Sequence, residues 1–492
     1  MKKPLSFFPL FLGVVLLLAS ACAREKQAVK FESEDDLPGK RVVVQTGTVY
    51  DFDLSERDDI ELFRYNNMPD CIAALVSGKV DVYKDDEVAL PPLDQRRQGI
   101  QLVARGSEVF PCGFACRKDD LELVGQLNAF LADIRESGLY QEIYDRWMDM
   151  DREELPHVPA DIPVFTEGEP IRVASSSNTA PLGYRVGVKQ WEGFEIELLK
   201  RFAASVERPL DIKPYDAAAG PAALQTGRAD IWCGCIFITE ERQEQFLFSD
   251  PYYGCRSAYF VCRDREAALN AWEQFKHSFH KNLVEENRWR FILNGLKETL
   301  ILAFWSILLG TVMAAGICWM KRSRHKWIRT ICKIYTMILQ GLPQLVLLMV
   351  MFYLILAKTS LSATSVAVIS FSMVFSAYVG EVFSSAIGSV GKGQTEAGIA
   401  LGFTPVQTFI YVVLPQAIHR ILPLYKAECV SLFKSTSIVG YVAIQDLTRA
   451  GDLIRSRTFD AFFPLIVVSI IYFILAFLLG KAMELLIKDK KV

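Results

Sequence analysis

The sequence predicts a multidomain chain in which two α/β units are followed by an all-α membrane domain of five helices. The chain has 492 residues, enough for two or three domains, and 51% of them are hydrophobic, which is too high for an ordinary soluble protein. Short β-branched runs alternate with helical patterns up to residue 264, and five long apolar segments follow residue 290. The net charge of -3 comes without a basic patch interleaved with aromatics, so we expect no nucleic-acid partner.

The N-terminus has the pattern of a secretory signal peptide over residues 1–21. An apolar run follows two lysines and ends before Ala19 and Ala21, and it is too short to span a bilayer. Cys22 then resembles the lipidated cysteine of a bacterial lipobox, although Ala19 stands where leucine is usual. We expect Cys22 to be lipid-anchored, with simple cleavage or an uncleaved leader as the alternatives, and residues 22–36 to be a charged tether.

The exported part is divided by its composition into residues 37–152, an acidic proline-containing linker at 153–169, and residues 170–264. The first unit resembles the second lobe of polar-amino-acid solute-binding proteins in its strand-Gly-Thr, its DVYKDDE and its terminal IYDRW. The second resembles the first lobe of that family in GFEIE and FSDPYY. The resemblance implies one two-lobed, periplasmic-binding-protein-like domain with its lobes circularly permuted. Two unrelated half-domains, or tandem copies that each lack a lobe, remain the alternative.

The same resemblance implies a site for a small-molecule amino acid ligand. In that family an arginine of lobe one holds the ligand's α-carboxylate and an aspartate of lobe two its α-ammonium, and Arg242 and Asp86 stand at those positions. A guanidinium matches a planar carboxylate, and a ligand bridging two lobes favours their closure. The backbone amides of Gly47 and Thr48, at a helix start, are expected to take the carboxylate as well. The alternative is a surface arginine and a helix-capping aspartate.

Three departures from the family alter the expected ligand. Phe237 stands where a serine or threonine is usual, Thr179 where an aromatic covers the ligand, and Val49 where a second threonine follows Gly-Thr. The site has lost hydroxyl donors and gained an apolar ring. We therefore expect a small or apolar amino acid, or a different ligand, bound with low affinity.

Cysteine spacing gives no indication of a metal site. Seven of the eleven cysteines lie between Cys71 and Cys262, and none of the spacings matches a zinc ribbon or a Cys-x-x-Cys redox pair. We expect mostly small buried side chains with one disulfide at most, whose pair the sequence leaves open.

A charged stalk over residues 265–290 leads to a membrane domain over residues 291–492. The expected spans are about 296–320, 331–357, 363–387, 422–444 and 461–486. Basic residues after the first span and at the C-terminus place both on the cytoplasmic side, together with the loop at 394–417 that follows the third span, and residues 22–290 are expected outside a bacterial inner membrane. A kink is expected at Gly341 and Pro343.

Glu381, Glu428 and Lys434 are charged residues that fall within the expected spans. Because charge is costly in a bilayer, they are expected to face a substrate pathway or to form structural pairs between helices.

Glu396 to Pro415 reads EAGIALGFTPVQTFIYVVLP and resembles the EAA coupling loop of ATP-binding-cassette (ABC) importer permeases. The matches are Glu396, Ala397, Gly402, Val412, Leu414 and Pro415, and Gly398 replaces the family's second alanine. We expect a helix over 394–401, a left-handed turn at Gly402, a second helix opened by Pro405, and its end at Leu414-Pro415, within a loop spanning 394–417.

The membrane half also resembles polar-amino-acid ABC permeases in NGLKETLILAFWSILLG, QGLPQLVLL, SAYVGEVFSSAI and ECVSLFKSTSIVG. The resemblance implies a type I importer subunit that is not an enzyme and has no cofactor of its own. ATP and Mg²⁺ would be bound by a separate ABC ATPase subunit, and two copies of the chain would form the pathway. The segment GSVGKGQT lacks the spacing of a phosphate-binding loop. A ligand-gated channel or a sensor with the same two-lobe domain is the alternative.

Overall fold

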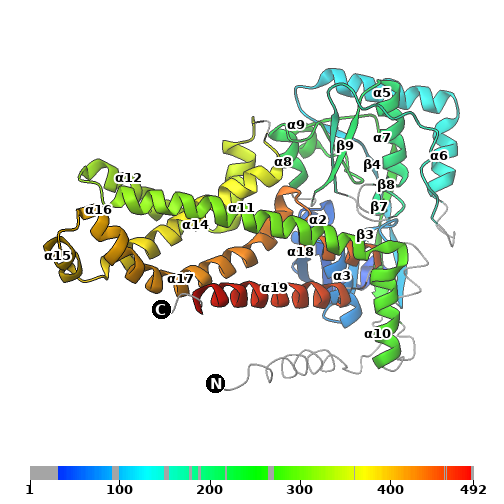
Figure 1. Cartoon of the computed structure of the whole chain (residues 1–492). Helices are drawn as coiled ribbons and strands as arrows, with labels where there is room; N and C mark the ends of the chain where they lie inside the picture. The colour runs from blue at the N-terminus through cyan, green and yellow to red at the C-terminus, as the bar shows by residue number, and fades with distance from the viewer. Residues whose placement is uncertain are drawn as a thin grey trace.

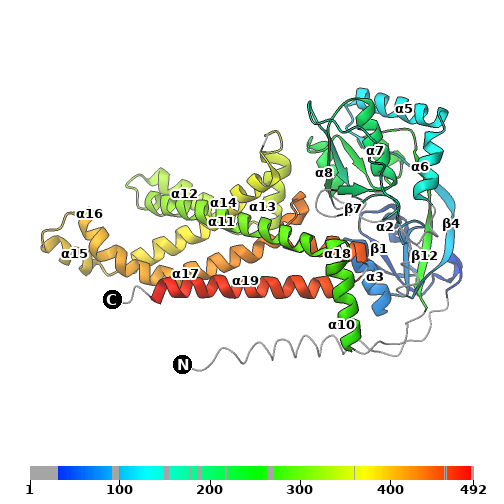
Figure 2. The ribbon, with the colours of Figure 1, turned by 45° about the vertical axis from the view of Figure 1, so that its right-hand side comes forward.

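The computed structural model describes residues 31–90, 99–148, 155–176, 180–186, 190–215, 219–263, 271–359, 361–458, 460 and 462–488. Figures 1 and 2 show an α/β part at one end of the molecule and a set of long helices extending away from it. Cys22 and Thr179 lie outside the described residues, so the lipid anchor and the role of Thr179 remain predictions.

Two five-stranded sheets form the α/β part. The first has the order β2-β1-β3-β12-β4, with β1, β2 and β3 parallel and β12 antiparallel to both β3 and β4. The second has the order β11-β5-β10-β6-β9. Strands β7 and β8 pair separately. The strand bounds are β1 Arg41–Gln45, β2 Glu61–Tyr65, β3 Val82–Asp86, β4 Ile100–Cys112, β5 Ala115–Cys116, β6 Ile171–Ser175, β7 Tyr184–Val186, β8 Gln190–Glu192, β9 Leu210–Pro214, β10 Ile231–Cys233, β11 Leu247–Phe248 and β12 Tyr253–Cys262.

The chain passes between the two sheets twice, which corrects the expected cut at residues 153–169. It leaves the first sheet at the end of β4 and returns to it through β12, so that Tyr253–Cys262 belongs with the earlier strands. The helices before the linker belong instead with the second sheet. The Trp147 indole donates to Glu197 (2.8 Å), a fully buried carboxylate that also pairs with Arg146 and Arg201. Each lobe is therefore built from separated stretches of chain.

The helices of the α/β part cover both sheets. Their bounds are α2 Val49–Ser55, α3 Met68–Ser77, α5 Leu121–Glu136, α6 Leu139–Trp147, α7 Phe194–Ser205, α8 Gly220–Gln225 and α9 Glu240–Gln245, and α10 Ala271–Phe279 leads from this part toward the long helices. A run of buried side chains from both sheets and from α5, α6 and α7 forms one core. Burial of these apolar faces holds each helix against its sheet.

Within the described residues, three helices are long and apolar enough to cross a membrane, and the number rises to five if each of two bent pairs is one span. The bounds are α11 Trp289–Lys321, α12 Lys326–Gly341, α13 Gln344–Val350, α14 Ala363–Gly388, α15 Lys392–Ala400, α16 Pro405–Thr408, α17 Leu414–Ser435, α18 Leu447–Thr458 and α19 Phe463–Lys488. Short π-helical or 3₁₀ segments continue α13, α16 and α17.

The second expected span, 331–357, is not a straight helix. α12 and the segment Gln344–Ile355 meet at 109°, and Pro343 lies in the break. Proline has no N–H to donate and excludes the helical backbone before it, which is the physical reason for the break. The predicted kink at Gly341 and Pro343 is thereby confirmed.

Candidate functional site: a cavity between the lobes

A cavity of about 170 Å³ lies where the two sheets face each other. The carboxyl ends of β1 and β3 reach it from the first sheet, and those of β6, β9 and β10 from the second. Five residues expected from the sequence to bind ligand line this one cavity: Gly47, Thr48, Asp86, Phe237 and Arg242. Binding pockets for drug-sized molecules measure about 300–1,000 Å³, so this cavity suits a smaller molecule.

Asp86 is the acidic group that the sequence predicts to bind ligand, and Asp85 and Asp452 also line the cavity. Asp86 ends β3, and the Tyr50 hydroxyl donates to its Oδ1 at 2.6 Å. Burial raises the pKa of Asp86 to about 6, against the opposing hydrogen bonds from Tyr50 and Cys255. A cation placed beside this carboxylate would lower the pKa of Asp86 again, because an opposite charge offsets the cost of burial.

Arg242 is the basic group on the other lobe. It lies in α9, where Thr239 caps the helix by accepting from the Arg242 N–H at 3.3 Å. Its guanidinium donates to the Phe237 carbonyl (3.1 Å) and lies 5.7 Å from the centre of the Trp232 ring. Burial lowers the pKa of Arg242. Asp86 and Arg242 thus bring opposite charges to one small cavity from two lobes.

The amides of Gly47 and Thr48 are used by the chain itself. The Gly47 N–H donates to Asp51 Oδ2 (2.9 Å), and Thr48 caps α2 by accepting from the Asp51 N–H. The Thr48 N–H is directed at the Gln45 carbonyl at 3.4 Å. In this structure the Gly47 amide is thus taken by the Asp51 carboxylate, and a contact of these two amides with a ligand carboxylate stays a prediction.

Phe237 forms an apolar wall of the cavity at the hinge, which is the place where the chain passes between the two sheets. Its ring stacks on Phe110 of β4 at 5.1 Å and meets Tyr50 edge-on at 5.9 Å. It is almost fully buried, so it links the two lobes in addition to lining the cavity. An apolar ring here favours a ligand with a small or apolar side chain.

Helix α18 of the helical part closes the cavity, a feature that the sequence analysis missed. Arg449, Asp452 and Ser456 of α18 line it together with the lobe residues. Arg455 forms an ion pair with Asp70, the N-terminal-turn acid of α3. The available signal was the unusual set of arginines between the last two spans, a place where the positive-inside rule disfavours them.

A second contact joins the other lobe to the broken helix. Arg228, in the turn before β10, packs its guanidinium 4.3 Å from the centre of the Phe352 ring. The same group donates to three main-chain carbonyls: those of Phe352 (3.3 Å) and Leu356 (2.7 Å) at the end of the α13 segment, and that of Leu361 (3.2 Å) just before α14. A cation at a helix C-terminus is favourable because those carbonyls lack helical partners. The lobe of the first sheet thus contacts α18 and that of the second sheet contacts the α13 segment, while α18 also reaches Tyr184 of the second lobe through Arg457, 4.2 Å from the ring centre.

Helices α15 and α16 form an apolar projection at the end of the helical part farthest from the lobes (Figures 1 and 2). Gly402 ends the first helix with φ +87°, and Thr404 with Gln407 forms a capping box before Pro405, as the sequence predicts. Leu401 (79% exposed) and Val406 (66%) are presented to solvent. Glu396 and Ala397 lie in α15.

The expected end of the second helix at Leu414-Pro415 is wrong. A π-helical segment, Phe409–Val413, absorbs the missing hydrogen bond of Pro415, and α17 continues from Leu414. The helix therefore continues without interruption from the projection into the membrane domain.

Charged side chains of the helical part are largely paired between helices. Lys321 of α11 pairs with Glu381 of α14, and Lys426 of α17 pairs with Glu484 of α19, a pair that the sequence analysis missed. Lys434 lines an open groove along α17 that also contains Lys426. Glu428 lies in the same helix. The structural-pair alternative thus holds for Glu381.

Comparison with known proteins identifies the family to which the helical part is similar. Residues 306–492 match the model of the binding-protein-dependent transport system inner membrane component. The L-cystine transport system permease protein TcyB of Bacillus subtilis is 32% identical over 201 residues, covering 40% of this chain and 86% of the relative. This chain belongs to that permease family. The putative glutamine transport system permease GlnP of Rickettsia typhi is 30% identical, with 39% of this chain and 88% of the relative covered.

Family membership gives the C-terminal part its general role, that of a multi-pass inner-membrane permease component, which is not an enzyme. Among solved structures, an amino acid ABC transporter with histidines shares 30% identity at a TM-score of 0.40, covering 45% of this chain and all of the other. The family model covers residues 306–492, which lie within the helical part.

Proposed function

We propose that this chain is a fused substrate-binding and permease subunit of an ABC importer for a small amino acid. The observation that carries the proposal is the cavity shared by Asp86, Arg242 and α18, because one chain supplies both walls of a cleft and a helix of the permease at its mouth. The permease relatives are named for cystine and glutamine transport, which supports an amino acid as the ligand class.

In the proposed mechanism, the ligand's ammonium pairs with Asp86 and its carboxylate with Arg242. A zwitterion of the right length satisfies both lobes only when they are closed, so its binding energy favours closure. The ligand's side chain is then beside Phe237, and the small cavity excludes large side chains. Fusion keeps the binding domain at millimolar-order effective concentration beside its permease, so a weak site is sufficient.

Release is proposed to follow from the contacts between the lobes and the membrane helices. Asp70 ties one lobe to α18, and Arg228 ties the other to the α13 segment. Movement of these helices during the transport cycle would pull on the two lobes separately and open the cavity. ATP hydrolysis on a separate ATPase subunit docked at α15 and α16 would supply the energy, and two copies of the chain would enclose the pathway.

The proposal is tested with the full-length chain in detergent and with the chain plus its ATPase subunit in vesicles. Thermal unfolding is measured against each amino acid, and a stabilising ligand is then tested for stimulation of ATP hydrolysis. We expect Asp86→Asn and Arg242→Gln to abolish the stabilisation, whereas Arg105→Gln, a change to an exposed surface pair, retains it. Stabilisation that persists in both cavity variants would overturn the assignment of the ligand site.

A Glu396→Lys variant tests the ATPase-docking surface, since it reverses a charge on α15 without touching the cavity. Loss of ATPase association with unchanged ligand stabilisation is the expected result. Unchanged association would show that the subunit docks elsewhere.

A further inference from the structure

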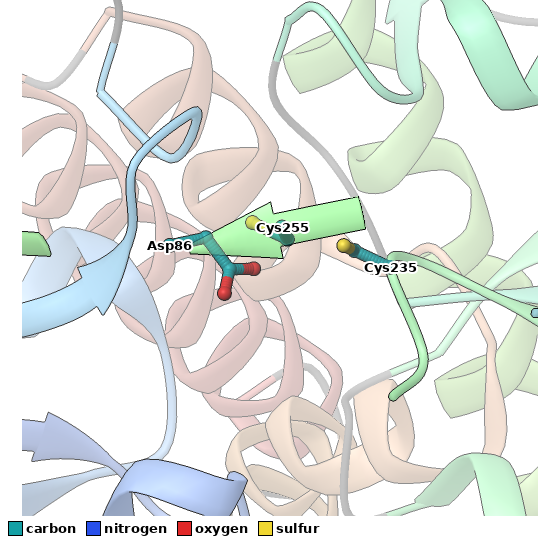
Figure 3. A group of neighbouring side chains, drawn as sticks. All are labelled: Asp86, Cys235 and Cys255. Carbon is teal, nitrogen blue, oxygen red and sulfur yellow. The ribbon is translucent and has the colours of Figure 1, made fainter. Parts of the chain in front are cut away.

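Three cysteines and one aspartate converge at the hinge of the lobes. The Asp86 carboxylate, Cys235 Sγ and Cys255 Sγ offer ligand atoms that all lie within 4.8 Å of one another. Figure 3 shows these side chains meeting from the end of β3, from β12 and from the loop after β10. The Cys112 thiol forms a hydrogen bond with that of Cys235. The ten cysteines that the structure describes are all free of disulfides.

The sheet register explains why these residues share a face. Ser257 of β12 pairs with Asp86, and Cys255 lies two residues along the same strand, so Cys255 points to the same side as the carboxylate. Tyr253 pairs with Cys112 of β4, which places the Cys112 side chain on that side too. Only the three-dimensional pairing brings these positions together, because 86, 112, 235 and 255 have no metal-motif spacing.

Cys235 approaches from the second sheet with its backbone held in an unusual conformation. Its φ is +52°, in the left-handed region that non-glycine residues seldom adopt. The Cys235 N–H donates to the fully buried Glu195 carboxylate at 2.6 Å, which fixes the residue in place. Such conformations persist where the surroundings impose them, and they are concentrated at functional sites.

We propose that Asp86, Cys235 and Cys255, with Cys112 available as a fourth ligand, bind a thiophilic divalent metal ion of the zinc class. Two or three sulfurs and one carboxylate oxygen match the ligands of Zn²⁺, whereas Ca²⁺ and Mg²⁺ take oxygen ligands. Tetrahedral zinc with Zn–S bonds of about 2.3 Å needs sulfurs about 3.8 Å apart, so ligand atoms that lie within 4.8 Å of one another need to approach by at most about 1 Å. Asp86 and Cys235 also line the cavity, which gives the ion a route of entry.

The metal and the amino acid would compete, because both use the Asp86 carboxylate. This consequence rests on the proposed function, whereas the metal site itself does not. Ligands from β3, β4 and β12 on one side and from the β10 loop on the other would also join the two lobes across their hinge.

The test uses the full-length chain in detergent, purified with a phosphine reductant. Zn²⁺ per chain is measured after desalting, and Cd²⁺ is titrated with the ultraviolet thiolate-to-metal absorption as readout. We expect one ion per chain and at least tenfold weaker binding in Cys235→Ser and in Cys255→Ser. Cys262→Ser is the matched control: it lies on the same strand, about 23 Å from Cys255, and should bind as the wild type does.

A second measurement covers the case in which a serine variant fails to fold. In the wild-type chain, Zn²⁺ should protect Cys235 and Cys255 from alkylation, read by mass spectrometry, and leave Cys262 unprotected. Absence of binding, binding unaffected by either substitution, or a disulfide joining two of the three cluster cysteines in protein isolated without reductant would overturn the proposal. Metal binding without any stabilisation by amino acids would instead count against the proposed ligand and leave the metal site standing.

Discussion

Restoring the family's alanine at position 398 is expected to damage the coupling loop. Gly398 of α15 lies against Thr408 of α16, and a Cβ added there would be 2.6 Å from the Thr408 Cγ2 and 3.0 Å from its Oγ1. Thr408 is fully buried and cannot move its methyl group into solvent. The departure from Glu-Ala-Ala in this chain is therefore explained by the close packing of the two short helices.

The size of the effect follows from two opposing contributions. Overpacking a buried contact costs about 1–3 kcal/mol, and alanine in place of glycine within a helix returns about 1 kcal/mol. The net penalty on the native arrangement of α15 and α16 is then up to about 2 kcal/mol, or up to about a thirtyfold loss in its population.

The assay is ATP hydrolysis by vesicles that contain the chain and its ATPase subunit, together with co-purification of the two. Gly398→Ala should lower both, and the double variant Gly398→Ala with Thr408→Ser, which removes the clashing methyl, should recover much of the loss. Gly393→Ala is the matched control, because it lies in the same helix with nothing within 4 Å of the added Cβ. Equal activity of the two alanine variants would refute the packing argument.

Other outcomes test the contacts between the lobes and the membrane helices. Arg228→Lys keeps the charge but loses the fork that contacts three carbonyls, so ligand-stimulated ATPase activity should fall several-fold while ligand-induced thermal stabilisation persists; a parallel loss of both would contradict this. Asp70→Arg should also reduce ligand-stimulated ATPase activity, because it removes an ion pair that contributes about 1.5–3 kcal/mol. The double variant Asp70→Arg with Arg455→Asp should recover part of that activity in a double-mutant cycle. Burial opposes ionisation of Glu286, but the hydrogen bonds and positive charges of Arg457 and Arg288 together outweigh it and lower the pKa of Glu286 below its ordinary 4.5. The ionised Glu286 carboxylate therefore stabilises the folded chain fully above pH 4.5, and this stabilisation is lost as the pH falls through the lowered pKa. The Tm of the wild type should fall more steeply on acidification than that of Glu286→Gln.

Local chemistry made several elements predictable. Gly402, Thr404 and Pro405 determine a bent helix pair because each restricts the backbone within its own turn. The break at Pro343 follows from the same kind of constraint. The end predicted at Pro415 failed because a π-helical segment accommodated that proline, a choice that depends on the packing of the continuing helix.

The ligand cavity was predictable only in part. Asp86 and Arg242 could be placed by their flanking motifs, and the structure brings them to one cavity. The sequence did not predict the hydrogen bond from the Gly47 amide to Asp51, nor that α18 lines the cavity. Both depend on side-chain positions between segments that lie far apart in the chain.

By itself, the sequence determined the α/β and helical division of the chain, the charged and apolar segments and the turn chemistry of the coupling loop, because hydropathy and backbone preference act over a few residues. The tertiary structure alone decided which stretches share a lobe, which helix closes the cavity and that the thiols of Cys235 and Cys255 meet beside Asp86. Those outcomes depend on strand register and on crossings between sheets, which bring together residues up to hundreds of positions apart and leave no periodic trace in the sequence.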